Sequence, residues 1–469
     1  MAISPTVPHQ ISRKKMAAIP IKDQQRREDG TKLKIIIVGA GLGGIGAAIS
    51  LLLAGHDVQI FEAANEIGEV GAGIQVLPNS SRVLQSWGMK EALDKYSTKP
   101  SRVNMLHWKG GVISHMDFAT SAAQYPGTFY WDFHRANLHR CLLDRAAELG
   151  ANIRTKARVS NVEPSSEGDF ATLTLENGEQ HVVDLVIGAD GINSNLREIM
   201  LGREDPPILT GDLAYRLLLS TKEMLKDPEL ASFVTDPQVN YWLGPDAHAV
   251  NYVLRGGELF NMVLLVPDDM PAGANTLAGD VEEMRALYKD WDHRIPKLLA
   301  LCESVYKWRL CIRSGMDSWS HPSGAFTLLG DAVHATLPYL ASGAGMALED
   351  AAVLGEIFGR SANPRDPAEK RRLLTIYEQC RKPRTEMVVE RGNRQQWLYH
   401  LHDGPEQEER DRAMQAKEEG EALAWRDSGL SPQLLGYKVE EDVDRFWHWG
   451  GSEINEVKVD SPARVQGKS

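Results

Sequence analysis

The sequence predicts an α/β protein with a Rossmann-type dinucleotide-binding domain, an antiparallel-sheet domain and a helical C-terminal extension. The first domain is indicated by a β-branched strand that leads through a glycine-rich turn into a helix over residues 34–54. The second is indicated by alternating apolar and polar segments between residues 201 and 318. From about residue 400 the chain is acidic and aromatic, which favours helices that pack against the body.

The composition limits the partners of this chain. The 469 residues are 42% hydrophobic, enough for a sizeable core, and the formal net charge is −12. This net negative charge argues against nucleic-acid binding, and no apolar run reaches membrane-spanning length. Four cysteines lie far apart without a CxxC pair, which favours reduced thiols in a cytoplasmic protein and no metal site. Residues 1–33 are expected to form a disordered tail, with organelle targeting as the alternative.

The first motif is a dinucleotide-binding pattern. Lys34–Val38 is predicted to be a strand, and a GxGxxG turn and a helix follow it, with glycines at Gly39, Gly41 and Gly44. The next strand ends in Glu62, which follows Gly39 by 23 residues and stands where an acid binds a ribose hydroxyl. Glycines let the backbone approach a pyrophosphate, and the helix N-terminus offers free N–H groups. The alternative is a glycine-rich turn in a nucleotide-free α/β fold.

The chain does not continue with the second mononucleotide-binding half of a nicotinamide dehydrogenase. Instead, a small-residue loop, Gly71–Gln75, leads into a helix, and a later helix starts at His134-Arg135. A hairpin is predicted to turn at Asn177-Gly178, because this dipeptide accepts positive φ at low cost. A buried strand, Leu185–Gly188, then runs into Asp190-Gly191.

A third motif lies late in the chain, in "GDAVHATLPYLASGAGMALEDA" at residues 330–351. A buried-looking run ends at Asp331, and a loop with Gly343 and Gly345 leads into a helix that starts near Gly345. Such a connection brings backbone N–H groups and the positive end of a helix dipole close to a ligand. The sequence therefore predicts a second ligand-contacting segment.

With these three motifs in this order, the chain resembles class A flavoprotein monooxygenases of the salicylate-hydroxylase-like group, particularly fungal members. The motifs are GxGxxG at 39–44, "DLVIGADGINSNLR" at 184–197 and "GDAVHATLP" at 330–338. Further matches such as "YEQCRKPR" and "LHDGPEQEERDR" extend the resemblance over roughly residues 34–445. It implies a glutathione-reductase-like FAD-binding domain (34–200 and 319–399), a substrate-binding sheet domain (201–318, with part of 101–132) and a helical extension (400–469).

The resemblance also implies which residues contact FAD. Glu62 would bind the adenosine ribose, and Asp331 would contact the ribityl or pyrophosphate part. Arg135 would pair with the phosphates or the ribityl chain, Gly73 would flank the flavin, and Asp190 would act near the pyrophosphate and at the nicotinamide approach. The alternatives are a solvated arginine at a helix start and two turn aspartates. His334, in the same motif, is either an acid–base group or structural.

The loop at 342–345 would lie along the isoalloxazine ring. Its contacts would come from Gly343, Ala344 and Gly345. Relatives carry Ala-Gln-Gly-Ala-Asn where this chain carries Ala-Ser-Gly-Ala-Gly at 341–345, so backbone contacts would replace the Gln and Asn side chains.

The implied reaction is an NAD(P)H- and O2-dependent hydroxylation. NADH or NADPH would reduce FAD, and oxygen would form a flavin C4a-hydroperoxide whose distal oxygen goes to an electron-rich aromatic carbon. The substrate would be a phenolic or other aromatic small molecule, salicylate-like or polyketide-derived, as in secondary metabolism. The enzyme would be a monomer or homodimer.

The substrate pocket is expected on the sheet domain. Its polar candidates are Arg216, Tyr241, His248 and Tyr252. We hypothesise that Arg216 holds the phenolate and that Tyr241 relays a proton or orients the ring. The alternatives are an arginine and tyrosines that pack within the sheet and a histidine in a turn.

Two other function classes are compatible with the sequence. One is an FAD-dependent epoxidase or oxidoreductase of the same fold that acts on a non-phenolic substrate, which labelled oxygen would distinguish. The other is a flavin-free interaction protein, because the same fold also serves as a prenyl-GTPase escort. Asp331 and Arg135 argue against this second class, and a purified protein that takes up no FAD would favour it.

Overall fold

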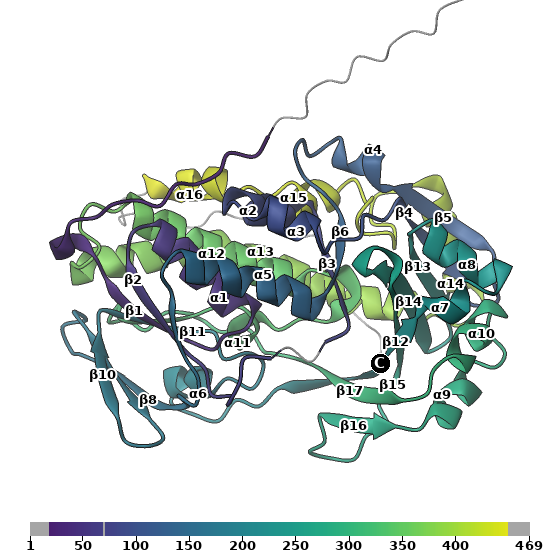
Figure 1. Ribbon diagram of the computed structural model, residues 1–469, viewed down its shortest axis with the longest axis horizontal. Helices are drawn as coiled ribbons and strands as arrows, with labels where there is room; N and C mark the ends of the chain where they lie inside the picture. The colour runs from purple at the N-terminus through teal and green to yellow at the C-terminus, as the bar shows by residue number, and fades with distance from the viewer. Residues whose placement is uncertain (1–17, 69–70, 449–469) are drawn as a thin grey trace, which may run out of the picture.

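The computed structural model describes residues 18–68 and 71–448, which form two lobes around two large β-sheets (Figure 1). The first lobe contains a five-stranded parallel sheet with the order β18-β11-β1-β2-β7. Strand β1 lies in its centre, so the glycine-rich turn that follows β1 lies at the carboxyl edge of the sheet. The strands are β1 (Lys34–Val38), β2 (Asp57–Phe61), β7 (Asn152–Arg154), β11 (Leu185–Gly188) and β18 (Phe326–Leu328).

A layer of helices covers one face of this sheet (Figure 1). Helix α1 is small and apolar on nearly all sides, and it packs against α12, which is why it is almost entirely buried. Helix α13 carries the chain from this lobe towards the other. The helices of this lobe are α1 (Leu42–Leu53), α2 (Pro78–Ser86), α3 (Lys90–Asp94), α5 (Arg135–Glu148), α6 (Asn195–Leu201), α11 (Asp331–His334), α12 (Gly343–Arg360) and α13 (Pro367–Tyr399).

A three-stranded antiparallel sheet lies on the opposite side of the parallel sheet. It consists of β8 (Val159–Pro164), β9 (Ala171–Leu175) and β10 (Gln180–Val183). The hairpin between β9 and β10 turns at Asn177-Gly178 as predicted, and Gly178 has φ 85°. The predicted buried strand Leu185–Gly188 follows directly as β11.

The second lobe is built on an eight-stranded sheet, which confirms the predicted sheet domain. All neighbours pair antiparallel except β4 and β13, which run parallel. Strand β14 is buried along its whole length, because one face of the sheet meets the first lobe and α8, α9 and α10 cover the other. The strands are β4 (Arg102–His107), β5 (Val112–Asp117), β12 (Ile208–Ser220), β13 (Val239–Gly244), β14 (Ala247–Leu254), β15 (Leu259–Pro267), β16 (Thr276–Gly279) and β17 (Val305–Ile312). Its short helices are α4 (Phe118–Ala122), α7 (Thr221–Met224), α8 (Pro228–Thr235), α9 (Val281–Leu287) and α10 (Arg294–Ala300).

The small-residue stretch after the second strand differs from the predicted loop. Residues Gly73–Val76 form strand β3, which pairs antiparallel with β6 (Trp131–His134), and α2 begins two residues later. The pairing partner lies almost 60 residues away in the sequence, so local pattern could not reveal it. This two-stranded ribbon carries Gly73 to the boundary between the lobes, where Gly73 donates its backbone N–H to Asn261.

Residues 18–33 differ from the expected disordered tail, whose first 17 residues lie outside the described residues. Arg27 donates hydrogen bonds to the carbonyl oxygens of Phe358, Gly359 and Ser361 at the C-terminus of α12. Lys22 forms an ion pair with Glu356 of the same helix. A basic side chain at a helix C-terminus satisfies unpaired carbonyls and complements the helix dipole. This segment is therefore attached by polar contacts, which leave no apolar periodicity in the sequence.

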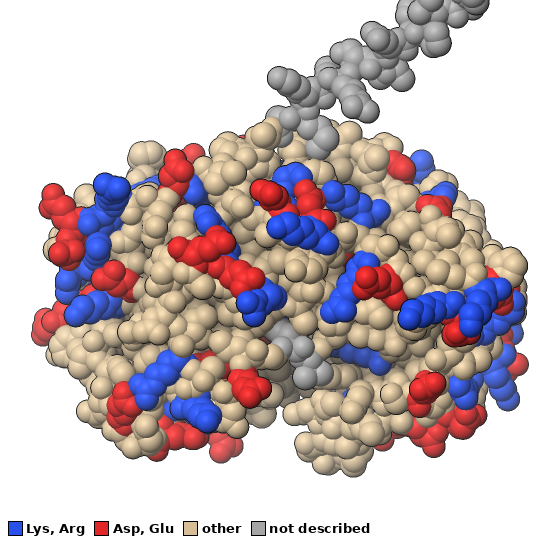
Figure 2. Space-filling model, viewed as in Figure 1, with Lys and Arg blue, Asp and Glu red and all other residues tan. Residues whose placement is uncertain are grey.

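The C-terminal region contains three helices, as predicted, joined by turns, and the last of them ends at Trp447. Helix α16 packs against α12 and α13, and it follows α14 and α15. Residues 449–469 of the expected extension lie outside the described residues. On the face seen in Figure 2, basic and acidic side chains are interspersed, and the surface is hollowed where the two lobes meet. The helices are α14 (Pro405–Ala416), α15 (Ser431–Leu435) and α16 (Val439–Trp447).

Candidate active site

A cavity of about 340 Å³ lies between the carboxyl edge of the parallel sheet and the eight-stranded sheet. One end is lined by the glycine-rich turn and by the start of α12, and we call it the cofactor end. The other is lined by β12, β13, β14 and β15, and we call it the substrate end. Three of the sequence motifs, far apart in the chain, therefore meet at one cavity.

The glycine-rich turn is closed by contacts that need glycine. A Cβ on Gly44 would lie 2.0 Å from the carbonyl oxygen of Gly39, and Gly39 itself has φ 108°. At Gly41, by contrast, a Cβ would meet no atom of the described chain within 4 Å, and this residue lines the cavity. The turn thus closes tightly on its protein side and leaves open space at the N-terminus of α1, which fits a pyrophosphate.

Glu62 braces this turn. Its Oε2 accepts a hydrogen bond from the backbone N–H of Ala40 (2.8 Å), and its Oε1 accepts one from Ala64 (2.7 Å). The acid predicted to bind a ribose therefore also fixes the loop that would surround the phosphates. A carboxylate oxygen accepts more than one hydrogen bond, so this bracing is compatible with a ribose contact.

The third motif reaches the cavity through Asp331. The preceding Gly330 has φ 63°, and its N–H donates to Oδ2 of Asp350, 3.0 Å away. Asp331 is exposed at the start of α11 and lines the cofactor end. His334 of the same motif is buried, and its Nε2 lies 2.6 Å from Asp350, so the structural alternative holds for this histidine.

Four buried charged side chains support the start of α12, and we call them the buried ion cluster. They are Glu349, Asp350, Arg381 and Arg384. Burial raises the pKa of Asp350, but His334 and Arg381 outweigh it, and the resulting pKa is about 2. Arg381 also donates to the carbonyl oxygen of Met346 in the first turn of α12. This cluster therefore fixes both Gly330 and the beginning of α12.

Helix α12 begins at Gly343, two residues before the predicted start. Gly343 and Ala344 line the cavity, whereas Gly345 is buried, and a Cβ there would lie 3.4 Å from Ser80 of α2. Gly345 thus faces α2 and not the cavity, because the helix has already turned by that residue.

Asp190 also differs from its expected position. Its carboxylate accepts hydrogen bonds from the Ser194 hydroxyl (2.6 Å) and the Leu196 N–H (3.0 Å) at the start of α6. The cavity is lined instead by its neighbours Ala189 and Gly191. The side chain of Asp190 supports a helix N-terminus, which is the turn alternative for this residue.

Arg135 and Gly73 both line the cavity. Arg135 begins α5, and its backbone N–H donates to the carbonyl oxygen of Ala72. A Cβ on Gly73 would lie 2.4 Å from the ring of Tyr252, so glycine lets this ring approach the β3 backbone. The structure therefore brings the predicted flavin-flanking glycine against a predicted substrate-pocket residue.

At the substrate end, Arg216 is the notable charge. It lies on β12, and its guanidinium packs 5.0 Å from the ring of Trp308. No carboxylate among the described residues forms an ion pair with it. Burial, and then the charge of Arg135, lower its pKa from the ordinary value. An unneutralised arginine in a cavity favours an anionic ligand.

The remaining candidates form an aromatic wall. Tyr241 and Tyr252 are buried and line the cavity, and burial raises the pKa of each phenol. Both hydroxyls are therefore neutral at physiological pH and can donate hydrogen bonds, which fits orienting a substrate better than removing its proton. His248 lies within β14 and is buried, so the turn alternative is wrong for this histidine.

Sequence reasoning missed several residues at the substrate end. Tyr339 lines the cavity, and behind it lie Asp212 and His400. Gln75 also lines the cavity and donates to Asp132, whose pKa burial raises to about 8. Tyr339 lies in the stretch 330–351 and Gln75 ends the predicted loop Gly71–Gln75, but nothing local marks either as a site residue, and His400 lies in none of the motifs.

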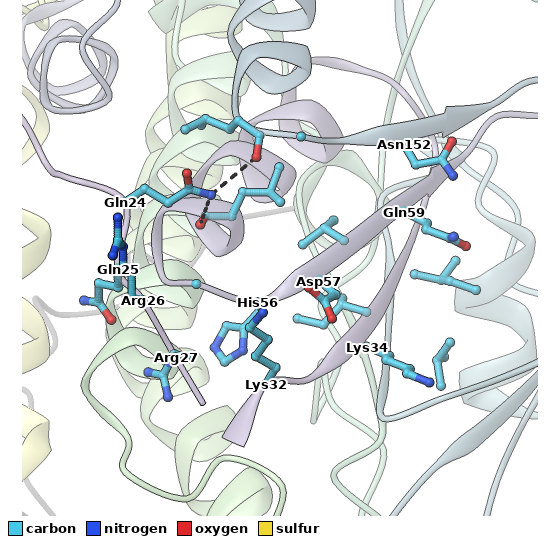
Figure 3. A pocket seen from close by; sticks show the side chains of 18 of the residues that line it. Gln24, Gln25, Arg26, Arg27, Lys32, Lys34, His56, Asp57, Gln59 and Asn152 are labelled. Carbon is cyan, nitrogen blue, oxygen red and sulfur yellow. Dashed lines mark hydrogen bonds between the residues drawn. The ribbon is translucent and has the colours of Figure 1, made fainter. Parts of the chain in front are cut away.

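A separate hollow of about 750 Å³ lies beside β1 and β2, next to the N-terminal segment (Figure 3). Two of its polar groups serve the fold: Gln24 donates to the carbonyl oxygens of Leu52 and Leu149, and His56 accepts from the N–H of Leu33. Among residues 18–68 and 71–448, no metal-binding cluster is found, and no helix is both long and apolar enough to cross a membrane.

Comparison with known proteins identifies the cofactor. The family described as "FAD binding domain" matches residues 32–392, and the chain belongs to this family. It is 40% identical over 414 residues to FAD-dependent monooxygenase OpS4 of Beauveria bassiana (strain ARSEF 2860), covering 86% of this chain and 95% of the relative. It is 35% identical over 409 residues to 3-amino-4-hydroxybenzoate 2-monooxygenase of Streptomyces cremeus (85% and 96% covered). A solved salicylate hydroxylase substrate complex shares the fold, with TM-score 0.73 and 22% identity (89% and 98% covered).

The protein is an FAD-dependent monooxygenase of the class A type. This confirms the predicted family, the FAD cofactor and the enzymatic class, and it sets aside the flavin-free alternative. The residues present fit FAD. The open space at Gly41 fits its phosphates, and the N-termini of α1 and α12, which both reach the cavity, fit its phosphate and flavin parts.

Proposed function

We propose that this enzyme uses NADH or NADPH and O2 to hydroxylate a phenolic aromatic small molecule that carries an anionic group. The observation that carries the proposal is Arg216, a cation that has no carboxylate partner among the described residues and that lies at the substrate end beside Tyr241, Tyr252 and aliphatic side chains. A relative named for 3-amino-4-hydroxybenzoate supports a substrate with both a phenol and a carboxylate.

In this proposal, residues 34–200 and 319–399 hold FAD, and residues 201–318 with 101–132 cover the substrate. FAD, when bound, supplies the electron transfer and the oxygen activation. The chain's own part is to bind the cofactor. The residues proposed for this are Gly39, Gly41, Gly44, Glu62, Gly73, Arg135, Asp331, Gly343 and Ala344. Asp190 and Gly345 are proposed only as supports of the surrounding backbone.

Arg216 and Tyr241 are proposed as the substrate-binding pair. A free phenol has a pKa near 10, so only about one molecule in a thousand is phenolate at pH 7. A neighbouring guanidinium in a desolvated cavity favours the phenolate, and a shift of about three units corresponds to about 4 kcal/mol. Tyr241 would donate a hydrogen bond that orients the ring. The phenolate is the electron-rich form that hydroxylation requires.

The test is a screen of phenolic acids with the FAD-loaded enzyme. NADH and NADPH consumption and product masses are recorded under labelled oxygen. We expect at least one hydroxybenzoate to stimulate consumption and to gain one labelled oxygen atom on the ring. If alkenes gain oxygen and phenols do not, the enzyme is an epoxidase. If no phenol stimulates consumption, the proposal is wrong.

A further inference from the structure

A buried acid and an amide lie side by side at the wall of the cavity. Gln75 of β3 and Asp132 of β6 are cross-strand neighbours, and Nε2 of Gln75 donates a hydrogen bond to Oδ1 of Asp132, 3.1 Å away. Gln75 lines the cavity and is 9% exposed, whereas Asp132 does not line it and is 1% exposed. We call these two residues the amide–acid pair.

The two-stranded ribbon turns the amide–acid pair towards the second lobe. Side chains alternate along a strand, so Gln75 shares a face with Gly73. Gly73 lies against the ring of Tyr252 on β14 and donates its N–H to Asn261 on β15. On the opposite face of the ribbon, Phe133 packs in the core of the first lobe. Strand β6 also packs against β14, so Gln75 faces the sheet from which Tyr252 projects.

Backbone pairing fixes the position of the acid. The N–H and C=O of Asp132 exchange two hydrogen bonds with Thr98, each 2.9 Å long. Both backbone groups therefore point away from β3, and Asp132 and Gln75 form a non-hydrogen-bonded cross-strand pair. In such a pair the two side chains lie closer together than in a hydrogen-bonded one. The carboxyl group is thus held next to the amide of Gln75.

The acid also decides which end of the amide is left for a ligand. Oδ1 of Asp132 can accept a hydrogen bond whether the carboxyl is ionised or carries a proton on Oδ2. Oδ2 has no hydrogen-bond partner among the described residues, and burial raises the pKa of Asp132 to about 8, so a proton is expected there at neutral pH. With Nε2 bound to Oδ1, Oε1 of Gln75 remains an acceptor, and no described residue donates to it.

We propose that Oε1 of Gln75 accepts a hydrogen bond from an amino or hydroxyl substituent of the substrate, an inference that rests on the proposed function. The amide–acid pair is then a second specificity site in addition to Arg216. Arg216 selects an anionic group, whereas Gln75 selects an uncharged hydrogen-bond donor on the same ring. Gln75 contacts the substrate, and Asp132 acts through Gln75 as a positioning residue. The substrate class becomes aromatic acids that carry an amino or a further hydroxyl group.

The depth of Gln75 makes this selection strong. A ligand that fills the space without a donor would leave Oε1 buried and unpaired, which costs free energy. A site that hydrogen-bonds its substrate therefore rejects an analogue that lacks the donor more strongly than an apolar site rejects a change of size. A methyl group is close in size to an amino group. A methyl analogue consequently separates the hydrogen bond from the fit of the ring.

The experiment measures dissociation constants of matched ligand pairs by equilibrium dialysis on the FAD-loaded, oxidised enzyme, without NADH or NADPH. One pair is 3-amino-4-hydroxybenzoate and 4-hydroxy-3-methylbenzoate, and the other is 4-amino-2-hydroxybenzoate and 2-hydroxy-4-methylbenzoate. The variants are Gln75→Met and Asp132→Asn. Gln59→Met is the matched control, because Gln59 is exposed on β2 and does not line this cavity. FAD content and FAD affinity are measured for every variant.

We expect the parent to bind the amino member of at least one pair about tenfold more tightly than the methyl member, as one buried hydrogen bond provides. Gln75→Met should reduce this ratio to less than about twofold. Asp132→Asn should at least halve the ratio, because an asparagine amide can hold Gln75 in either orientation. Gln59→Met should keep the parent's ratio. A loss of packing alone would weaken both members of a pair and leave their ratio unchanged.

The outcomes separate this inference from the proposed function. If the parent binds both members of each pair equally well, the inference is wrong and the proposed function stands. The same holds if Gln75→Met keeps the parent's ratio, and a loss of FAD affinity in that variant would then place Gln75 at the cofactor. An unchanged ratio in Asp132→Asn would show that Asp132 does not position the amide. If the parent binds no member of either pair, the inference and the proposed function are both wrong.

Discussion

The two ends of the cavity are built from different parts of the chain. The cofactor end is made largely of backbone: a glycine turn, the N-terminus of α1 and the N-terminus of α12. The substrate end is made of side chains that project from β12, β13 and β14. A backbone site depends on glycine spacing within a short segment, whereas a side-chain site depends on the register of several strands.

The two ends also differ in how they are held. The buried ion cluster fixes the cofactor end from behind, through Gly330 and the first turn of α12. At the substrate end, Arg216 has no carboxylate partner among the described residues, and His248, which lines the cavity, contacts His400 through Nδ1 only. The first arrangement favours rigidity, and the second leaves binding capacity for a substrate.

The largest expected effect tests whether the cofactor end depends on the buried ion cluster. Asp350→Asn should lower the free energy of unfolding by about 3–5 kcal/mol, because Arg381 and His334 lose their buried counter-charge. Urea unfolding measures this. The exposed Asp331→Asn serves as the stability control. Equal stability of both variants would show that the cluster is not needed.

The same carboxylate should make stability depend on pH. Its folded-state pKa of about 2 lies below the ordinary value of 3.8, so its contribution is complete above about pH 4 and is lost as pH falls towards 2. The difference amounts to about 2 kcal/mol. In Asp350→Asn, this part of the stability lost in acid should be absent when the free energy of unfolding is measured against pH.

A pair of glycine variants separates the two faces of the turn. Gly44→Ala should disrupt the turn, because its Cβ would lie 2.0 Å from the Gly39 carbonyl oxygen. The melting temperature should therefore fall, and the affinity for FAD should fall by more than about a hundredfold. Gly41→Ala should keep its melting temperature, because its Cβ meets no described atom, yet weaken FAD binding. Titration of the apoprotein with FAD and thermal melts measure both. An unchanged FAD affinity in Gly41→Ala would contradict the pyrophosphate placement.

At the substrate end, Arg216→Met should leave FAD content unchanged while hydroxylated product falls by about a hundredfold at neutral pH. The reason is that the phenolate loses its cation and becomes rare below its pKa near 10. Raising the assay pH towards 9 should recover part of the rate, because solution conditions then supply the phenolate. Product and peroxide are quantified, with the exposed Arg140→Met as control. If product formation falls only a few-fold, Arg216 serves packing within the sheet and does not hold the phenolate.

The smallest effect is expected at Gly345. Gly345→Ala should change FAD affinity and turnover by less than about twofold, because the new Cβ makes an ordinary contact with Ser80 inside a helix. Gly343→Ala, at the cavity, is the comparison variant and should alter flavin reduction more strongly. A large loss of FAD affinity or turnover in Gly345→Ala, without one in Gly343→Ala, would indicate that Gly345 contacts the flavin.

Several features of the cofactor end could be predicted because they are local. The strand Lys34–Val38, the turn Gly39–Gly44 and Glu62 lie within 30 residues; the strand and the turn form as predicted, and Glu62 directly follows β2. The contacts differ from the expected ones where a residue could face either of two neighbouring elements. Asp190 faces α6 and Gly345 faces α2, and a motif match does not specify the direction of either.

The sequence by itself determined the fold class, the cofactor family and the order of the motifs along the chain. Tertiary structure alone decided which side chains share the substrate end. His248, His400 and Asp212 are separated by up to 188 positions, and their contacts depend on sheet register and on the return of α13 to the second lobe. Local patterns follow from short-range backbone geometry, whereas such a group exists only after long-range packing has fixed every strand relative to its neighbours.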